Sequence, residues 1–153
     1  MKSIGIVGSR RRDSKADLEV CRKVFLSVYE EGDIIVSGGC KQGGDRFAEI
    51  FIKEYNIPED KVIIHYPDKS KLDPEKMKRN PRWAYAEINY ARNTLIARDS
   101  DILIAVVAED RKGGTEDTIK KAKKMQKTIT YVPELTEEDR IKYKEDDFDP
   151  YGI

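Results

Sequence analysis

The sequence predicts an α/β protein with one parallel sheet, and three observations support that prediction. Short apolar segments alternate along the chain with longer segments whose apolar residues recur at helical spacing. Residues 3–7, 33–37 and 101–107 are nearly continuous in apolar character, as strands buried on both faces are. Each of these three segments leads into a turn that contains glycine. Strands that alternate with helices in this way indicate a parallel sheet with helices on both faces.

The first helix is expected over residues 14–31. Ser14 followed by Asp17 resembles a capping box, and Gly32 stands where a C-cap glycine would end the helix. The apolar residues that have helical spacing are Leu18, Cys21, Val24, Phe25 and Val28.

The rest of the chain continues the alternation. Asp45 is expected to cap a second helix over residues 45–55, which leads to a strand at 61–65. The polar stretch 66–82 is long enough to indicate a functional lid or a mobile segment. The remaining elements are expected as a helix over 83–98, a helix over 115–126 and a strand over 128–132. The buried stripe of the helix over 83–98 is expected to be Ala84, Ile88, Ala91 and Leu95.

These elements fit a Rossmann-like three-layer sandwich with a five-stranded parallel sheet of order 3-2-1-4-5. In that order the topology switches between the strands at 3–7 and 101–107, and ligands bind outside the carboxyl ends of the strands at such a point. A nucleotide-binding domain is expected over residues 1–133, and an acidic, aromatic C-terminal tail over 134–153.

The composition favours a soluble, cytoplasmic protein. The chain has 29 basic and 29 acidic residues among its 153, which gives no overall attraction to nucleic acid or membrane. No apolar run is long enough to span a membrane, and a strand follows Met1 too closely for a signal peptide. Cys21 and Cys40 are expected to be free thiols, and with His65 as the single histidine no metal site is expected.

Three glycine-bearing turns, Gly8-Ser9-Arg10, the loop 38–44 and Gly113-Gly114-Thr115, are candidate phosphate sites. Each precedes an expected helix, and helix N-termini present unpaired N–H groups and a partial positive charge. The loop 38–44 lacks the Gly-Lys-Ser/Thr ending of a Walker motif, so it is either a flexible turn or a contact to phosphate or ribose. In Gly113-Gly114-Thr115, the threonine is expected to cap the helix or reach a phosphate oxygen. Glu116 and Asp117 add negative charge there, which favours contact through ribose or base.

Polar and aromatic side chains near these loops supply further candidates. Arg10 is expected to pair with phosphate. For Arg11 and Arg12, pairing with phosphate and a solvated basic turn are equally good interpretations. Arg92 and Asn93 lie near one face of the helix over 83–98, where they would clamp a phosphate or ribose or simply decorate a surface. The aromatic residues that would stack on a base or pack the helix are Trp83, Tyr85 and Tyr90.

Together these motifs resemble the SLOG superfamily, the Rossmann-like fold shared by DprA/Smf proteins and LONELY GUY enzymes. The likeness is greatest to its small stand-alone YspA-like branch, and it spans residues 4–132. That branch carries G-S-R after the first strand, S-G-G-x-x-G-x-D-x-x-A-E after the second, R-N on the third helix and G-T at the fourth. The matching residues are Gly8-Ser9-Arg10, residues 37–49 with one extra loop position, Arg92-Asn93 and Gly114-Thr115.

The resemblance implies binding of a nucleotide or nucleotide derivative such as AMP, ADP-ribose or NAD, with a sensor domain as one such role and with no required cofactor. It also implies a homo-oligomer. The nucleotide-binding residues are then Gly8, Ser9, Arg10, Gly38, Gly39, Gly43, Gly44, Asp45, Arg92, Asn93, Gly113, Gly114 and Thr115.

Two other functions stay open. One is a nucleotide N-glycosidase or a deoxyribosyltransferase-like enzyme, but Thr118 stands where LONELY GUY enzymes have their catalytic glutamate, so Glu49 or Glu116 would have to substitute. Asp45 and Asp117 are the other carboxylates that would serve if they face the crevice. The other is DNA binding like that of DprA, against which the neutral net charge argues. The basic run that would support it is Lys69, Lys71, Lys76, Lys78, Arg79 and Arg82.

Overall fold

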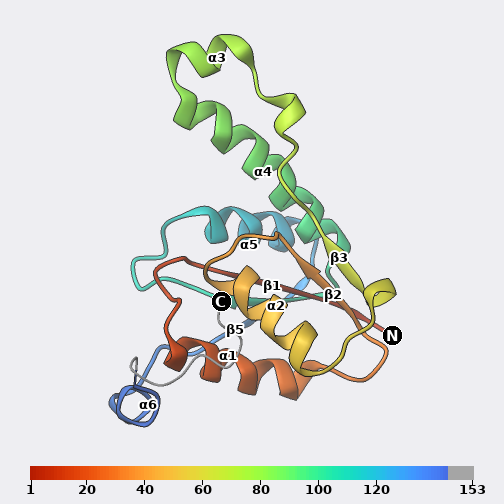
Figure 1. The fold of residues 1–153 in the computed structure, drawn as a ribbon, viewed down its shortest axis with the longest axis vertical. Helices are drawn as coiled ribbons and strands as arrows, with labels where there is room; N and C mark the ends of the chain where they lie inside the picture. Colours follow the sequence, from red (N-terminus) through yellow and green to blue (C-terminus); the bar gives the residue numbers. More distant parts are fainter. Residues whose placement is uncertain (145–153) are drawn as a thin grey trace.

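A computed structural model describes residues 1–144, which form helices around one central sheet (Figure 1). The sheet has five parallel strands in the order β3-β2-β1-β4-β5, which confirms the expected order. β1 lies at the centre, so its carboxyl end adjoins those of both β2 and β4. The strands are β1 Ser3–Gly8, β2 Ile34–Ser37, β3 Val62–Ile64, β4 Ile102–Val106 and β5 Thr128–Tyr131.

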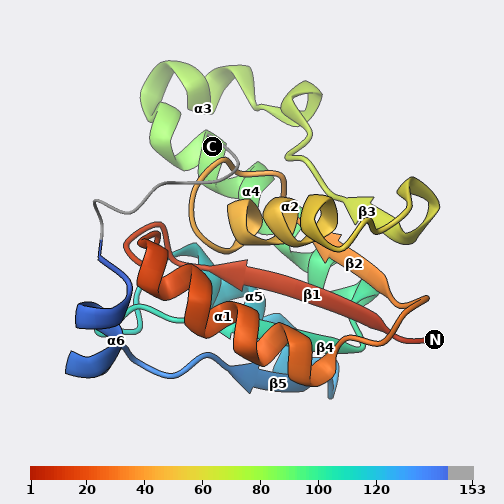
Figure 2. The same cartoon turned by 60° about the horizontal axis from the view of Figure 1, so that its bottom comes forward.

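Helices cover both faces of the sheet, as Figures 1 and 2 show. Ile4 and Ile6 of β1 pack with the helices of one face, and the neighbouring Val7 packs with those of the other, because successive side chains of a strand point to opposite sides. The three-layer sandwich is therefore as predicted. One face carries α1 Lys15–Val28 and α2 Gly44–Glu54, and the other carries α4 Pro81–Asp99 and α5 Gly114–Lys124.

Helix α1 begins as the sequence predicts but ends earlier. Ser14 caps it, and Asp17 closes the expected capping box. The helix stops at Val28, where Tyr29 takes extended backbone angles, so the prediction of Gly32 as its C-cap is wrong. Gly32 instead has a φ of +96° in the turn before β2, a conformation that favours glycine.

The N-terminal caps predicted for α2 and α5 are both wrong. Gly43 caps α2 in place of Asp45, and Gly113 caps α5 in place of Thr115; neither helix has a side-chain cap. Both cap glycines have positive φ, and the chain needs this backbone geometry to turn from strand into helix. Each helix therefore starts one residue earlier than expected.

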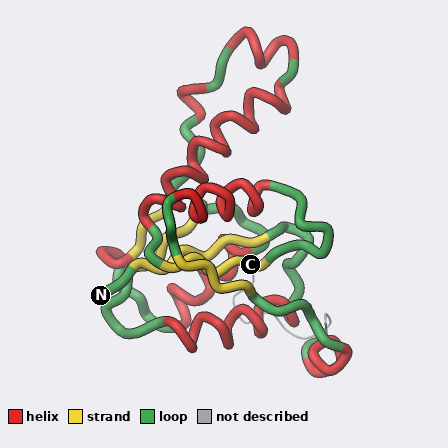
Figure 3. Tube along the Cα trace, turned by 180° about the vertical axis from the view of Figure 1, so that it is seen from behind, coloured by secondary structure: helices red, strands yellow, loops and turns green. Residues whose placement is uncertain are grey.

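A helical arm stands where the sequence predicted a polar connection, and it extends away from the sheet (Figures 1 and 3). The stretch 66–82 contains a short 3-10 turn, η2 Lys69–Lys71, and a helix, α3 Pro74–Arg79. α4 begins at Pro81, before the predicted start, because the side chain of Asn80 accepts the N–H of Trp83 and caps the helix.

The buried face of α4 differs from the predicted stripe. Ala84 and Ile88 are buried as expected, whereas Ala91 is exposed. Asn93 and Ile96 are buried instead. The first turns of α4 pack against α3 and the later turns pack against α5 and the sheet, so the buried face changes direction along the helix.

The last elements are a 3-10 turn before β3, η1 Glu59–Lys61, and α6 Glu137–Lys142 after β5. Leu135 packs against the core on the α1 side of the sheet. Residues 145–153 of the predicted tail lie outside the described residues, so a boundary at 133 stays a prediction. Within residues 1–144 no helix is long and apolar enough to cross a membrane. Cytoplasmic location and a homo-oligomer stay predictions.

Candidate functional site

A cleft of about 410 Å³ lies at the carboxyl ends of the strands, where the connections of β1 and β4 diverge. This is the position expected for the ligand site of such a sheet. The loops after β1, β2 and β4 meet there with one side of α4. The predicted binding residues that line the cleft are Gly8, Ser9, Arg10, Asp45, Arg92, Asn93, Gly113, Gly114 and Thr115.

The other predicted residues, the glycines of the loop after β2, lie beside the cleft without lining it. A Cβ at Gly44 would lie 2.8 Å from the carbonyl oxygen of Val7 and still closer to the amide nitrogen of Gly8. Gly43 has a φ of +69°, and its N–H donates to the carboxylate of Asp13 at 2.8 Å. These glycines allow α2 to start against the end of β1, so their contacts are internal to the protein.

Asp45 holds the same loop from inside. Its carboxylate accepts the backbone N–H of Gly38 at 3.1 Å and that of Cys40 at 3.0 Å. Burial raises the pKa of Asp45, and the two N–H donors and the nearby Arg92 guanidinium oppose that rise. Asp45 is the one carboxylate that lines the cleft within residues 1–144.

Arg92 and Asn93 join the walls of the cleft to each other. Arg92 Nη1 donates to the carbonyl of Gly38 at 2.6 Å, and its Nε donates to Asn93 Oδ1 at 3.0 Å. Asn93 Nδ2 then donates to the carbonyl of Gly114 at 3.3 Å and to Asp117 Oδ2 at 3.2 Å. This chain of bonds connects the loop after β2, α4 and α5, so both side chains position the walls of the cleft.

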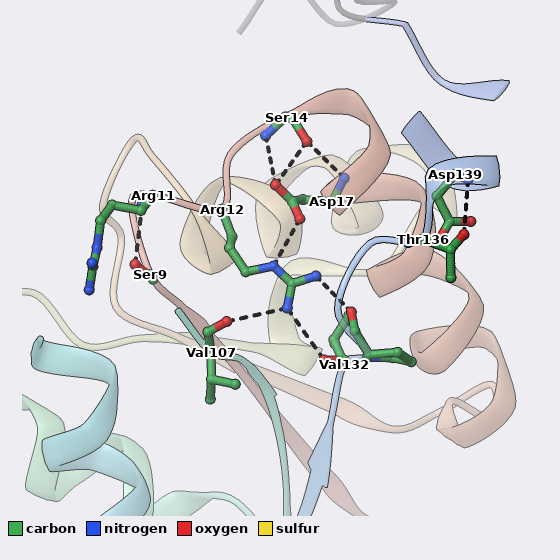
Figure 4. Close-up of polar contacts among 10 residues, drawn as sticks. Ser9, Arg11, Arg12, Ser14, Asp17, Val107, Val132, Thr136 and Asp139 are labelled. Atoms are coloured by element: carbon green, nitrogen blue, oxygen red, sulfur yellow. Dashed lines mark hydrogen bonds and ion pairs between the residues drawn. The ribbon is translucent and has the colours of Figure 1, made fainter. Parts of the chain in front are cut away.

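Three consecutive arginines after β1 have different environments. Arg12 is buried and donates to Asp17 Oδ1 at 2.9 Å and to the carbonyl of Val132 (Figure 4). Arg11 points away from it and makes a bidentate pair with Asp110 at 2.7 Å. That guanidinium lowers the pKa of Asp110 to about 2. Arg10 and Arg11 are both exposed and line the cleft, and of the two only Arg10 has no ion-pair partner among residues 1–144.

The cleft has unneutralised positive charge near α5. Arg10 and Lys112 line it, and neither has an ion-pair partner in the described part of the chain. The N-terminus of α5 lies beside them without a side-chain cap, and a Cβ at Gly113 or Gly114 would meet no atom within 4 Å. Backbone N–H groups, helix dipole and two cations are therefore open to an anion here.

Of the carboxylates suggested for catalysis, Asp45 lines the cleft, whereas Glu49, Glu116 and Asp117 do not. Glu49 lies on α2 with a side chain 50% exposed, and it pairs with Lys53 at 3.5 Å. Glu116 pairs with Arg111 at 2.8 Å. Both side chains are held by neighbouring cations, and neither faces the space where a nucleotide would lie.

The cysteines and the histidine also have identifiable surroundings. Burial raises the pKa of the Cys21 thiol to about 12, and Cys40 lines the cleft; both are free. His65 Nε2 lies 2.6 Å from Asp99 Oδ2, and His65 does not line the cleft. No group of His, Cys, Asp or Glu side chains in residues 1–144 is arranged to hold a metal ion.

Sequence reasoning missed several residues of the cleft lining, among them Ala86, Ile96, Lys112 and Thr118. Lys112 directly precedes the Gly113-Gly114 motif, and this adjacency could have identified it as a residue of the site. Thr118 was noted for its departure from a catalytic glutamate, although it forms part of the lining. Among the aromatic candidates Tyr90 lines the cleft, whereas Trp83 and Tyr85 are exposed outside it.

Comparison with known proteins relates the fold to DprA. No family model matches the chain, and no curated protein matches it. DNA processing protein A (DprA) from Streptococcus pneumoniae superposes with a TM-score of 0.66 at 19% identity, covering 91% of this chain and 53% of that one. The chain therefore spans about half the length of that DprA.

A second solved structure gives the same result. DprA from Helicobacter pylori superposes with a TM-score of 0.58 at 22% identity, covering 89% of this chain and 67% of that one. That structure concerns the single-stranded DNA binding mode of the Helicobacter protein. The chain therefore has the fold of these two DprA structures. Membership of the SLOG superfamily and of its YspA-like branch, which the sequence motifs indicated, stays a prediction.

Proposed function

We propose that the protein binds a nucleotide or a nucleotide derivative, with a phosphate at the N-terminus of α5. The observation that carries the proposal is the pairing of an uncapped helix end with Arg10 and Lys112, which have no ion-pair partner within residues 1–144. An anion there would gain the N–H groups of the helix and two charge-assisted contacts. Inorganic phosphate, AMP, ADP-ribose and NAD share this chemistry.

The α4 side of the cleft suits the rest of a nucleotide. Tyr90 and Asn89 line it beyond the helix end. One side of the Tyr90 ring faces Lys121, whose Nζ lies 5.6 Å from the ring centre. A base has aromatic and amide partners here, as stacking and edge recognition require. A protein that binds a nucleotide-derived signal and does not convert it would act as a sensor.

Isothermal titration calorimetry with inorganic phosphate, AMP, ADP-ribose and NAD tests this proposal. The variant Arg10→Ala should weaken binding of every phosphate-bearing ligand about tenfold, since one charged hydrogen bond contributes about 1.5–3 kcal/mol. The matched control is Lys120→Ala, an exposed lysine on α5 that does not line the cleft. Equal losses in both variants, or no binding of any of the four ligands, would contradict the proposal.

A second candidate is a single-stranded nucleic acid. The fold is that of a protein known for binding such a strand, and the arm carries basic side chains and the exposed Trp83. Lys76 pairs with Glu87, whereas the other cations of that run have no ion-pair partner in the described chain. Fluorescence anisotropy with oligothymidylate at two salt concentrations tests it: binding that weakens steeply with salt and with Trp83→Ala supports a strand on the arm.

The glycosidase function gains less support from the geometry. Such chemistry needs a carboxylate beside the sugar. Asp45 lines the cleft, but its carboxylate oxygens already accept two backbone N–H groups. Base release from AMP that disappears in Asp45→Asn would nevertheless establish that function.

A further inference from the structure

Four lining residues of the cleft are buried and form its floor: the apolar Val7 and Ile96 and the polar Asn93 and Thr118. Thr118 lies in the second turn of α5, is 2% exposed and lines the cleft together with Val7 and Ile96. A hydroxyl in such surroundings is costly to bury unless it finds a hydrogen-bond partner.

The hydroxyl of Thr118 has no such partner among residues 1–144. No fully enclosed side-chain nitrogen or oxygen of the described chain lacks a partner, so the Thr118 oxygen must be reachable from the cleft. Every other buried polar side chain described has at least one bond within the protein. Those partnered side chains are Arg12, Asp17, Asp33, Ser37, Arg46, Asn93 and Ser100.

The position of Thr118 along α5 places it near the sugar of a bound nucleotide. It lies four residues into α5 from Gly114, about 6 Å along the helix from the open N–H groups. A nucleotide whose phosphate occupies that helix end has its sugar, the unit next to the phosphate, at this depth. Asn93, the nearest buried amide of the lining, already donates both its bonds to α5, to Gly114 and Asp117.

We propose that Thr118 hydrogen-bonds a sugar hydroxyl of the bound nucleotide, so that the cleft selects ribonucleotides over deoxyribonucleotides. This inference rests on the proposed nucleotide function. A threonine hydroxyl donates one bond and accepts others, as a sugar hydroxyl does, so the two pair without a charge on either. A ligand without that hydroxyl leaves Thr118 unpaired on the buried floor of the cleft, which is the basis of discrimination.

Calorimetric titration with AMP, 2′-deoxy-AMP and 3′-deoxy-AMP tests the inference. The unchanged protein should bind AMP about fivefold to tenfold more tightly than one of the two deoxy analogues, the range of one neutral hydrogen bond. Thr118→Val keeps the shape and removes the hydroxyl, so it should abolish that preference. Thr118→Ser restores a hydroxyl and should restore the preference. Affinity for inorganic phosphate should be the same in all three proteins.

Thermal unfolding without ligand provides the control for folding. Thr118→Val removes an unpartnered hydroxyl, so its midpoint should equal or exceed that of the unchanged protein. The matched variant Ser100→Ala loses a buried bond to the carbonyl of Ile96 at 2.7 Å and should unfold at a lower temperature.

The outcomes separate this inference from the function on which it rests. If AMP binds but both deoxy analogues bind equally well, or if Thr118→Val keeps the preference, the selection by Thr118 is wrong and nucleotide binding stands. If neither phosphate nor any nucleotide binds, the proposed function fails and the inference fails with it.

Discussion

The two glycine loops beside the cleft are alike in sequence and opposite in structure. The loop after β2 is closed by internal contacts: Asp45 accepts two of its N–H groups, and the N–H of Gly43 donates to Asp13. The loop after β4 is open, since a Cβ at Gly113 or Gly114 would meet no atom within 4 Å. The first loop uses its glycines for packing, whereas the second exposes its backbone.

This difference shows that glycine at a strand-to-helix turn has two distinct functions. Where a helix must start against another backbone, glycine is required because a side chain would not fit. Where nothing packs on the turn, glycine leaves room for a ligand near the helix end. The cleft combines one wall fixed by the protein with one wall available for binding.

The largest expected effect comes from adding a methyl group at the start of each helix. Gly44→Ala places a Cβ against the backbone of Val7 and Gly8 and should lower the free energy of unfolding by about 3 kcal/mol. Gly114→Ala, at the equivalent position of α5, should change it by less than about 0.5 kcal/mol. Urea unfolding of both variants measures the difference, and equal losses would show that the two loops are not distinct.

A smaller effect is expected from the side chains near the helix starts. Asp13→Ala removes the acceptor of the Gly43 N–H and one partner of Arg46, and should cost about 2 kcal/mol of stability. Thr115→Ala should cost less than about 0.5 kcal/mol, because Thr115 caps nothing. The same urea experiment tests this pair. A larger loss of unfolding free energy in Thr115→Ala than in Asp13→Ala would indicate that Thr115 does cap α5.

The smallest effect concerns one acid from each loop, Asp45 and Asp110. The pKa of Asp45 is raised by burial, so the folded state takes up its proton first and this group favours folding as pH falls through its raised pKa toward the ordinary value. The pKa of Asp110 is lowered to about 2 by Arg11, so its stabilising pairing is present above the ordinary pKa and is lost as pH falls toward 2.

Carboxyl carbon NMR during a pH titration measures both groups. The Asp45 signal should titrate at a pH above the ordinary aspartate value, and the Asp110 signal should titrate near pH 2. Arg11→Ala should raise the Asp110 midpoint and leave that of Asp45 unchanged. A midpoint of Asp45 below that of Asp110 would contradict the described environments.

Much of the fold was predictable because hydrophobic periodicity is a local property of the chain. The individual strands and helices and the capping box of Ser14 and Asp17 follow from residues close in sequence. The strand order and the two-sided helix cover then follow from the rules for parallel sheets with helical connections. The helix caps were less predictable: Asp45 and Thr115 are good caps by residue type, but the turns placed positive-φ glycines there. The arm was missed because α3 has six residues and no long apolar stripe.

The location of the candidate site was predictable from the sequence, whereas most of its side-chain contacts were not. The glycine motifs and the switch point located the cleft, and nine of the expected residues line it. Roles depended on partners distant in sequence. Arg92 reaches the carbonyl of Gly38, 54 positions away, and so became part of the wall.

The sequence by itself determined the alternation of strands and helices, the parallel sheet and the edge at which a ligand site forms, because each follows from local patterns and sheet geometry. Only the tertiary structure decided which of three adjacent arginines lines the cleft without an ion-pair partner among residues 1–144, and which hydroxyl lies on the floor of the cleft without a partner. Arg10, Arg11 and Arg12 have the same chemistry, and their environments differ because Asp17 and Asp110 approach from different elements. The free bonding capacity of Thr118 likewise depends on which side chains the packed helices leave beyond its reach.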